Sequence, residues 1–257
     1  MTFPFKFGKL PAKPLPKEAK KFALANFFAR VDWPAVPVKF GRHLLVRDWG
    51  MLGNDNVGNC VFAGAAHEHM YTTARGDVPD AMFTTENVLS DYSALTGYDP
   101  RDPDSDQGTD MHLAAEYRRT VGIIDAKGVR HRIKAHLSLK PGNISQLAMA
   151  SYIFEGMVGL GVMWPKSASQ QFEDHVPFSV VPRDGGLEGG HYMNVIGRNS
   201  LGHFVLVTYG RLQAATPKWV QKYADEAKVY LTGEALRGGM TPEGYDMPKL
   251  RAFLQHL

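Results

Sequence analysis

The chain has 257 residues, of which 44% are hydrophobic and 21% are charged, and these proportions are typical of a soluble globular protein with one large domain or two packed lobes. No stretch reaches the ~18 apolar residues that a membrane-spanning helix requires. The chain has one cysteine, Cys60, which excludes an internal disulfide and any zinc or iron–sulfur site built from several cysteines.

The net charge of +3 is unevenly distributed. Residues 1–21 carry six lysines and one acidic residue, Glu18, which leaves 23 basic and 25 acidic residues in the rest of the chain. A nearly neutral body does not indicate a nucleic-acid interface. The first residues include lysines but no apolar segment of the kind found in secretion signals, so we expect no signal peptide.

Six prolines between positions 4 and 37 indicate an extended arm over residues 1–48, with one short helix near 17–29. Three interpretations of this basic arm stay open. It is a solvated segment, it binds an acidic protein partner, or it contacts nucleic acid.

Three helices are predicted in the segment that follows. A loop rich in Gly and Asn ends at Asn59 and leads into small and apolar residues with helical spacing, so the first helix begins at or next to Cys60. Two more helices are expected over 84–95 and 110–121. The acidic, turn-rich segment 97–110 separates them.

The second half of the chain favours strands. A helix is predicted near 144–155 and is followed by strands over 157–164, 191–199, 202–210 and 227–231, of which the second and third form a pair. Turn residues and an amphipathic helix end the chain over 241–257. The pattern predicts an α+β fold with a helical lobe over 49–125 and a β-rich lobe with a C-terminal helix over 126–257.

Cys60 is the candidate nucleophile. A thiol at a helix N-terminus lies at the positive end of the helix dipole, which favours the thiolate, and Gly58 and Asn59 allow a tight turn before it. A nucleophilic cysteine needs a base, most often histidine. His191 is the candidate because it follows a Gly-Gly pair and opens an apolar strand. The alternatives are a buried core cysteine and a strand histidine bonded to the backbone.

The order of four segments resembles the papain-like cysteine peptidase superfamily. They are the loop from Asn54 to Cys60, Gly108-Thr109 ahead of a helix, the strand opened by His191, and residues 207–210. Cys60 and His191 are 131 residues apart, and residue 207 follows His191 by 16, both similar to the family. The resemblance covers roughly 49–231 and implies two lobes: a central Cys-bearing helix and an antiparallel, β-barrel-like lobe.

The resemblance also implies roles for individual residues. Cys60 and His191 form the catalytic dyad. Asn54, six residues before Cys60, stands where the family has an oxyanion glutamine, and its amide together with the Cys60 N–H would hold the oxyanion. The substrate-binding residues implied are Gly108, Thr109, Asn59 and Gly190.

The sequence departs from the family at several positions. Val207 stands where the family has the asparagine that orients the histidine, and Tyr209 replaces a tryptophan. Thr208 is the candidate third member, although strand alternation predicts that it points away from the imidazole. The absence of disulfides and the short segment before Asn54 suit a cytoplasmic bacterial or phage-associated relative.

No metal and no cofactor are expected. His67 and His69 are two residues apart and do not share a helix face. The acidic segment from Asp102 has Gln107 and Leu113 where a calcium loop has Gly and Glu.

Two functions remain in competition. The first is a papain-like cysteine peptidase or hydrolase that cleaves a peptide or isopeptide bond in a peptide or protein substrate. The second is a catalytically weak or inactive papain-like module with a binding or structural role, for instance in a phage particle. For either function we expect no membrane partner and no nucleic-acid substrate, and the N-terminal arm is the candidate contact for a protein partner.

Overall fold

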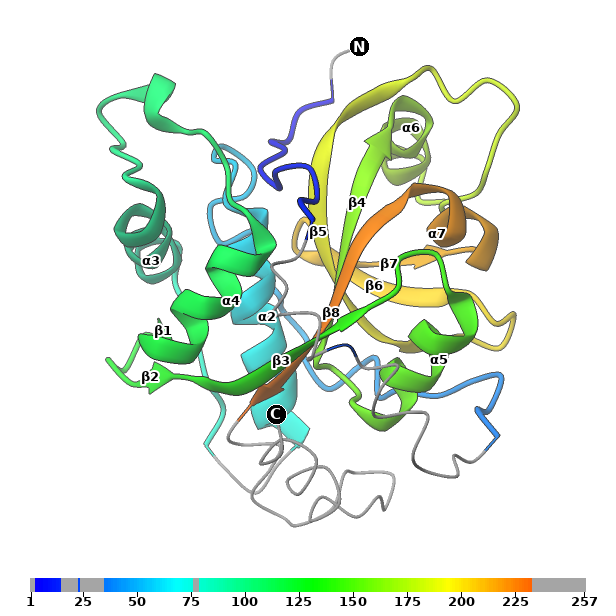
Figure 1. The fold of residues 1–257 in the computed structure, drawn as a ribbon, viewed down its shortest axis with the longest axis horizontal. Coiled ribbons are helices and arrows are strands. Elements are labelled where there is room, and N and C mark those ends of the chain that lie inside the picture. The colour runs from blue at the N-terminus through cyan, green and yellow to red at the C-terminus, as the bar shows by residue number, and fades with distance from the viewer. Residues whose placement is uncertain (1–2, 15–22, 24–34, 76–78, 233–257) are drawn as a thin grey trace.

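Helices from the first half of the chain and strands from the second half form two sides of the molecule (Figure 1). This arrangement comes from a computed structural model, which describes residues 3–14, 23, 35–75 and 79–232. Within these residues, no helix has the length and apolar character needed to cross a bilayer.

The helical side contains three helices at the positions that the sequence predicts: α2 (Cys60–Arg75), α3 (Thr85–Thr96) and α4 (Met111–Thr120). Side-chain caps fix where two of them begin, because Thr84 accepts a hydrogen bond from the backbone of α3 and Asp110 accepts two from α4. Helix α2 is buried along most of its length, since its first turns consist largely of alanine and glycine that let neighbouring elements approach closely.

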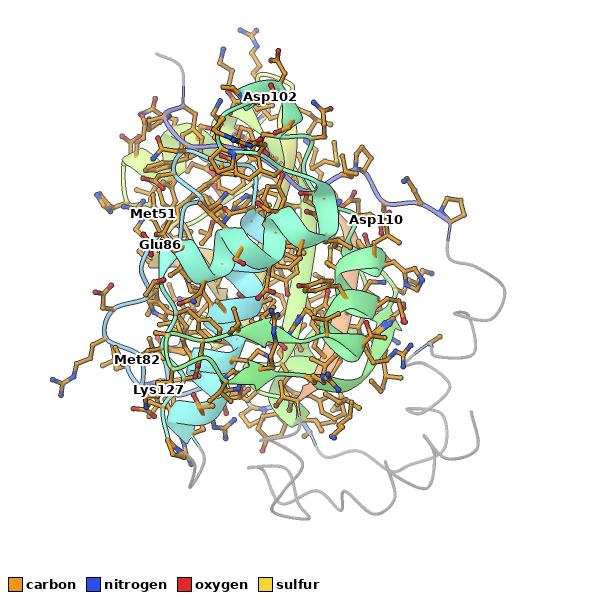
Figure 2. The ribbon with its side chains drawn as sticks, turned by 90° about the vertical axis from the view of Figure 1, so that its left-hand side faces the viewer. Met51, Met82, Glu86, Asp102, Asp110 and Lys127 are labelled. Carbon is orange, nitrogen blue, oxygen red and sulfur yellow. The ribbon has the colours of Figure 1, made fainter. Side chains whose placement is uncertain are left out.

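The acidic segment between α3 and α4 is fixed to the loop before α2. Asp106 accepts hydrogen bonds from the backbone N–H of Gly58 at 2.8 Å and from the hydroxyl of Tyr92 at 2.6 Å. Asp102 lies at the tip of this segment and caps a single 3-10 turn, Pro103–Ser105 (Figure 2). The segment therefore supports the turn that leads into Cys60.

The other side is a six-stranded antiparallel sheet in the order β3-β8-β4-β5-β6-β7. Helices pack against it, and β1 and β2 form a separate two-stranded sheet. The bounds are β1 (Ile123–Ile124), β2 (Arg130–His131), β3 (Ile133–Leu139), α5 (Ile144–Ile153), β4 (Val158–Pro165), α6 (Lys166–Glu173), β5 (Leu187–Arg198), β6 (Phe204–Thr208), β7 (Arg211–Ala215), α7 (Pro217–Tyr223) and β8 (Ala224–Thr232).

The expected α+β fold with a helical side and a β-rich side is confirmed. Among the described residues the sheet is open, with β3 and β7 as its edges, and not the closed barrel that the term β-barrel-like suggests. The predicted strands correspond to β4, β5, β6 and β8.

Strand β5 borders both cores of the molecule. Tyr192 faces α2 so closely that a Cβ added to Gly64 would lie 2.2 Å from its ring. Met193, the next residue, belongs to the core between the sheet and its helices. Side chains of a strand alternate in direction, so His191 faces the same core as Met193.

Two predicted elements cannot be compared with the structure. The helix near 17–29 lies outside the described residues except for residue 23, and the C-terminal helix over 241–257 lies wholly outside them. The boundaries 1–48, 49–125 and 126–257 stay predictions.

Candidate active site

Cys60 is the first residue of α2, as the sequence predicts. The carbonyl of Asn59 accepts hydrogen bonds from the N–H groups of Phe62 and Ala63 at 2.8 and 3.0 Å, which starts the helix at this point. The thiol is buried, with Cys60 only 2% exposed. Burial raises the pKa of the thiol to about 11, against weaker opposing effects from backbone hydrogen bonds of Tyr192 and Gly8.

Strand β5 passes this thiol one residue after His191, because the backbone of Tyr192 provides a hydrogen bond to Cys60. The imidazole is completely buried, and burial lowers its pKa to about 3. Its Nε2 lies 2.7 Å from the Thr208 hydroxyl, whereas Nδ1 has no hydrogen-bond partner among the described residues. Both members of the predicted pair are therefore uncharged at neutral pH.

The expectation that Thr208 points away from the imidazole is wrong. Asn194 pairs with Val207, so Thr208 comes opposite Met193 and shares the face of His191. Val207 lies on the opposite face, in the core with Trp49 and Tyr71. A shift of one residue in register exchanges the faces of all side chains, and here it gives the orienting position to a hydroxyl.

Tyr209 was noted in the sequence only as a replacement for tryptophan, and the structure gives it two contacts in the site. Its ring stacks on the His191 imidazole with centroids 4.3 Å apart and planes inclined by 14°. Its hydroxyl donates to the carbonyl of Lys6 at 2.9 Å. The amide of Asn54 donates to the same carbonyl at 3.4 Å and to the carbonyl of Val57 at 3.1 Å. Asn54 and Tyr209 thus direct two donors toward one oxygen.

The carbonyl of Lys6 belongs to the N-terminal arm, which runs between α2 and α4 on one side and β5 on the other (Figure 1, dark blue). The N–H groups of Gly8 and Lys9 donate to the Gly190 carbonyl at 3.2 and 3.0 Å. Thr109 donates to the Gly8 carbonyl at 2.7 Å and accepts from the N–H of Leu10 at 3.0 Å. Three predicted substrate-binding residues, Gly108, Thr109 and Gly190, therefore lie against the arm.

Close backbone contact holds the arm in this position. A Cβ added to Gly8 would lie 1.6 Å from the Gly58 carbonyl oxygen, and one added to Gly108 would lie 2.3 Å from the Gly8 oxygen. Such distances leave no room for a side chain at Gly8. The arm therefore passes directly over the turn that precedes Cys60.

Three phenylalanines anchor the same segment to the sheet side. Phe3 is 8% exposed and packs against Trp164 and Phe172, with ring centroids 5.7 and 6.0 Å away. Phe5 stacks on Tyr209 at 4.8 Å, and the ring of Phe7 meets that of His191 at 6.2 Å. The arm thus covers both the thiol and the imidazole.

Asn59 does not contact the arm in the manner predicted for a substrate-binding residue. It is fully buried, and its amide donates to the carbonyl of Leu52 at 2.8 Å. This contact stabilises the loop before α2, and a substrate-binding role for Asn59 stays a prediction.

The histidines that suggested a metal have separate partners. His67 donates to the carbonyl of Trp49 at 2.9 Å, and Glu68 between the two histidines pairs with Arg118 at 2.7 Å. In the described part of the chain, no group of three metal-binding side chains is close enough to hold an ion.

No protein-family model and no curated protein sequence matches the chain. Solved structures do. Xylellain, a cysteine protease from Xylella fastidiosa, has a TM-score of 0.62 at 14% identity, over 89% of this chain and 97% of its own. The ragweed pollen cysteine protease Amb a 11 in its proform has a TM-score of 0.58 at 15% identity, over 92% and 68%. Procathepsin B S9 from Trypanosoma congolense has a TM-score of 0.54 at 12% identity, over 88% and 86%.

These proteins share an architecture with the chain at low identity, and the resemblance first suggested by the order of Asn54, Cys60 and His191 agrees with them. The chain has the fold of the papain-like cysteine proteases.

Proposed function

We propose that the chain is a cysteine peptidase whose catalytic pair is covered by its own arm, residues 3–12. The proposal depends chiefly on one observation: the strand that carries His191 passes the thiol at the start of α2, through a backbone hydrogen bond from Tyr192, and the His191 ring contacts Thr208 through Nε2 while its Nδ1 is unpartnered among the described residues. A peptide or protein is the substrate class, with peptide or isopeptide hydrolysis as the reaction.

The arrangement assigns a direction to the proton transfer. When the Nε2–H donates to the Thr208 hydroxyl, the lone pair of the imidazole is on Nδ1. In an uncovered site Nδ1 takes the thiol proton as Cys60 Sγ attacks the substrate carbonyl carbon. The imidazolium then returns that proton to the leaving amine, and a thioester remains. Water hydrolyses the thioester to the carboxylic acid and restores the thiol.

The oxyanion of the tetrahedral intermediate needs donors that are already oriented. The amide of Asn54 and the hydroxyl of Tyr209 both donate to the arm carbonyl of Lys6, so both become available when the arm leaves. The N–H of Cys60, in the first turn of α2, is free of intrahelical bonding and is the third donor we assign.

In the covered state the same groups are inactive. Burial raises the pKa of the thiol and lowers that of the imidazole, so neither charged form is favoured. Displacement of the arm admits water, reverses both shifts and permits an ion pair. Two of the similar structures carry names that mark them as precursors, a proform and a procathepsin, which supports a latent form here.

A second candidate function is that of an inactive papain-like module with a binding or structural role. The complete burial of His191 and the 2% exposure of Cys60 favour it, because a protein that keeps its arm in place never exposes the pair. Such a module would serve as a component of a larger assembly, for example a phage particle.

Peptide hydrolysis by a full-length Gly8→Val chain separates the two candidates. The new side chain meets the Gly58 backbone and displaces the arm. We expect cleavage of a quenched-fluorescent peptide library that is lost when Cys60→Ala or His191→Ala is added. Phe3→Ala is a second, milder way to release the arm. Absence of cleavage in both folded variants, with Cys60 shown to be alkylated, would exclude the peptidase and leave the module.

A further inference from the structure

The side chain of Lys9 leaves the arm and enters a pocket in the sheet side. Its ammonium lies 2.7 Å from the Asp225 carboxylate and 2.8 Å from the carbonyl of Leu10, and the side chain is 0% exposed. The methylene stem passes over Gly161, where an added Cβ would lie 2.2 Å from the Lys9 Cε. The absence of a side chain at Gly161 therefore makes the room that Lys9 fills.

Burial of a lysine is costly unless the charge is paired. Lys6, three residues earlier in the same arm, is exposed to solvent. The burial of Lys9 is therefore specific to its position and not a property of every lysine in the arm. The pocket accepts Lys9 because Asp225 supplies the opposite charge at its end. This contact joins residues 216 positions apart in the chain.

The carboxylate of Asp225 can accept more hydrogen bonds than it does in this structure. Its Oδ2 accepts from Lys9 and from the N–H of Ala12 at 3.1 Å, whereas its Oδ1 is buried with no hydrogen-bond partner among the described residues. An unpaired buried oxygen is unfavourable. A guanidinium, which donates through two parallel N–H groups, would satisfy both oxygens of the carboxylate.

The pocket also lies beside the candidate catalytic pair. Gly8, the residue before Lys9, provides a backbone hydrogen bond to Cys60, and both residues donate to the carbonyl of Gly190, which directly precedes His191. A side chain in the pocket is thus fixed within about one residue of the backbone that passes the thiol. A pocket at this position determines which side chain a bound peptide presents.

We propose that Asp225 is the specificity-determining residue of the site and that the uncovered enzyme takes peptides with a lysine or arginine side chain in this pocket. The inference rests on the proposed peptidase function for its substrate step. Lys9 holds the pocket until the arm leaves, and a basic residue of the substrate then takes its place.

A substitution series at position 9 of the full chain measures what the pocket accepts. The readout is the rate at which iodoacetamide alkylates Cys60, the only cysteine, since this rate reports how well the arm covers it. We expect Lys9→Arg to protect as well as Lys9. The uncharged, unbranched Lys9→Met raises the rate about tenfold or more, because it removes the charged partner of the Asp225 carboxylate at the end of the pocket. Lys6→Met, in the exposed position, is the matched control and leaves the rate unchanged.

Asp225→Asn tests the pairing itself. In this background Lys9 and Lys9→Met chains should be alkylated at similar rates, while Glu226→Gln, one residue along β8, keeps the difference between them. A Lys9→Met chain that is as protected as wild type would overturn the pocket assignment. So would a preference for Lys9 that survives in Asp225→Asn.

The substrate step is then read from peptide cleavage by the folded Lys9→Met chain. We expect peptides with Lys or Arg to be cleaved at least about tenfold faster than the same peptides with Leu or Glu, as expected when one partner of a buried charge pair is missing. Cleavage without this preference would refute the inference while the peptidase stands. No cleavage at all, with the alkylation series as predicted, would refute the peptidase but leave a pocket that binds basic side chains.

Discussion

The catalytic pair we propose depends on the orientation of one imidazole. Thr208 is the only described residue within hydrogen-bond distance of the His191 ring, and its hydroxyl engages Nε2 and leaves Nδ1 without a partner. Stacking on Tyr209 restricts the ring plane. We therefore propose Thr208 as a positioning residue that acts through His191 and not on the substrate.

Replacement of Thr208 by the isosteric valine tests this role in the arm-displaced Gly8→Val chain. We expect Thr208→Val to lower kcat by about tenfold or more with little change in KM, because the imidazole loses its preferred orientation. Thr208→Ser keeps the hydroxyl and should restore most of the rate. The pH–rate profile provides the second readout, since its basic limb should move in valine and not in serine. Equal losses in both variants would mean that Thr208 only fills space.

The sequence could predict which residues belong to this site but not how each one is used. Cys60 stands out because it follows a turn and begins a helix. His191 stands out because it follows a Gly-Gly pair and begins an apolar strand. The role of Thr208 depends on the register between β5 and β6, which spacing along the chain does not fix. The hydrogen bond from Asn59 to its own loop had no signal in the sequence, because a polar residue in a turn looks the same whether it faces a cleft or its own loop.

At the scale of elements, the arm behaves as an added strand. It pairs with Thr109 in parallel and is anchored by three aromatic side chains on the sheet side. Its backbone makes four hydrogen bonds, to Thr109 and Gly190, and the aromatic contacts anchor the residues before them. Segments with few backbone bonds open at lower free energy than the body of a protein.

Phe3→Ala tests how the arm is held. Phe3 is 8% exposed and packs among aromatic rings. Its truncation to alanine should therefore weaken docking of the arm by about 3 kcal/mol. We expect faster alkylation of Cys60 and an almost unchanged midpoint of global unfolding by urea, because the arm detaches before the body unfolds. Pro4→Ala, an exposed neighbour, serves as the control. A large fall in the midpoint together with unaltered alkylation would show that the arm and the body unfold as one unit.

Helices and strands differed in how well the sequence predicted them. Helices α3 and α4 have caps and apolar spacing that predict them to within about one residue, and α2 begins at the end of a Gly- and Asn-rich loop. Strand β3 was not predicted, because it is an edge strand that alternates with Lys134, His136 and Ser138 and has a weak apolar signal. The path of the arm between the two sides has no local signal, since its partners lie about 50 to 216 residues away.

At the scale of the whole molecule, buried neutral histidines make the fold sensitive to acid. Burial lowers the pKa of His67 to about 4 and that of His191 to about 3, compared with about 6.5 in an unfolded chain. Between pH 6.5 and these values the two histidines bind more protons in the unfolded state than in the folded state. The free energy of unfolding therefore falls as the pH falls through this window.

We expect the urea midpoint to decrease from pH 7 to pH 4.5. His67→Gln, which can still donate to the Trp49 carbonyl but does not titrate, should show a smaller decrease over the same interval. An equal decrease in both chains would assign the acid sensitivity to other groups.

The arm also joins the two sides of the molecule, since residues 8–10 bond to Thr109 on the helical side and to Gly190 on the sheet side (Figure 1). The catalytic pair lies under this connection. On the proposed function, a change that exposes Cys60 must therefore separate the arm from both sides of the molecule.

The most direct test of this account is the pH dependence of Cys60 alkylation in the full chain, in Gly8→Val and in Gly8→Val with His191→Ala. We expect slow alkylation in the full chain, with a thiol pKa raised toward about 11 by burial. In Gly8→Val the rate should rise and the pKa should fall below the ordinary value of about 8.5. Removal of His191 should raise that pKa again, because the ion pair is lost. Two results would contradict the account. One is a full chain whose Cys60 is alkylated as fast as that of Gly8→Val, and the other is a thiol pKa in Gly8→Val that does not change when His191 is removed.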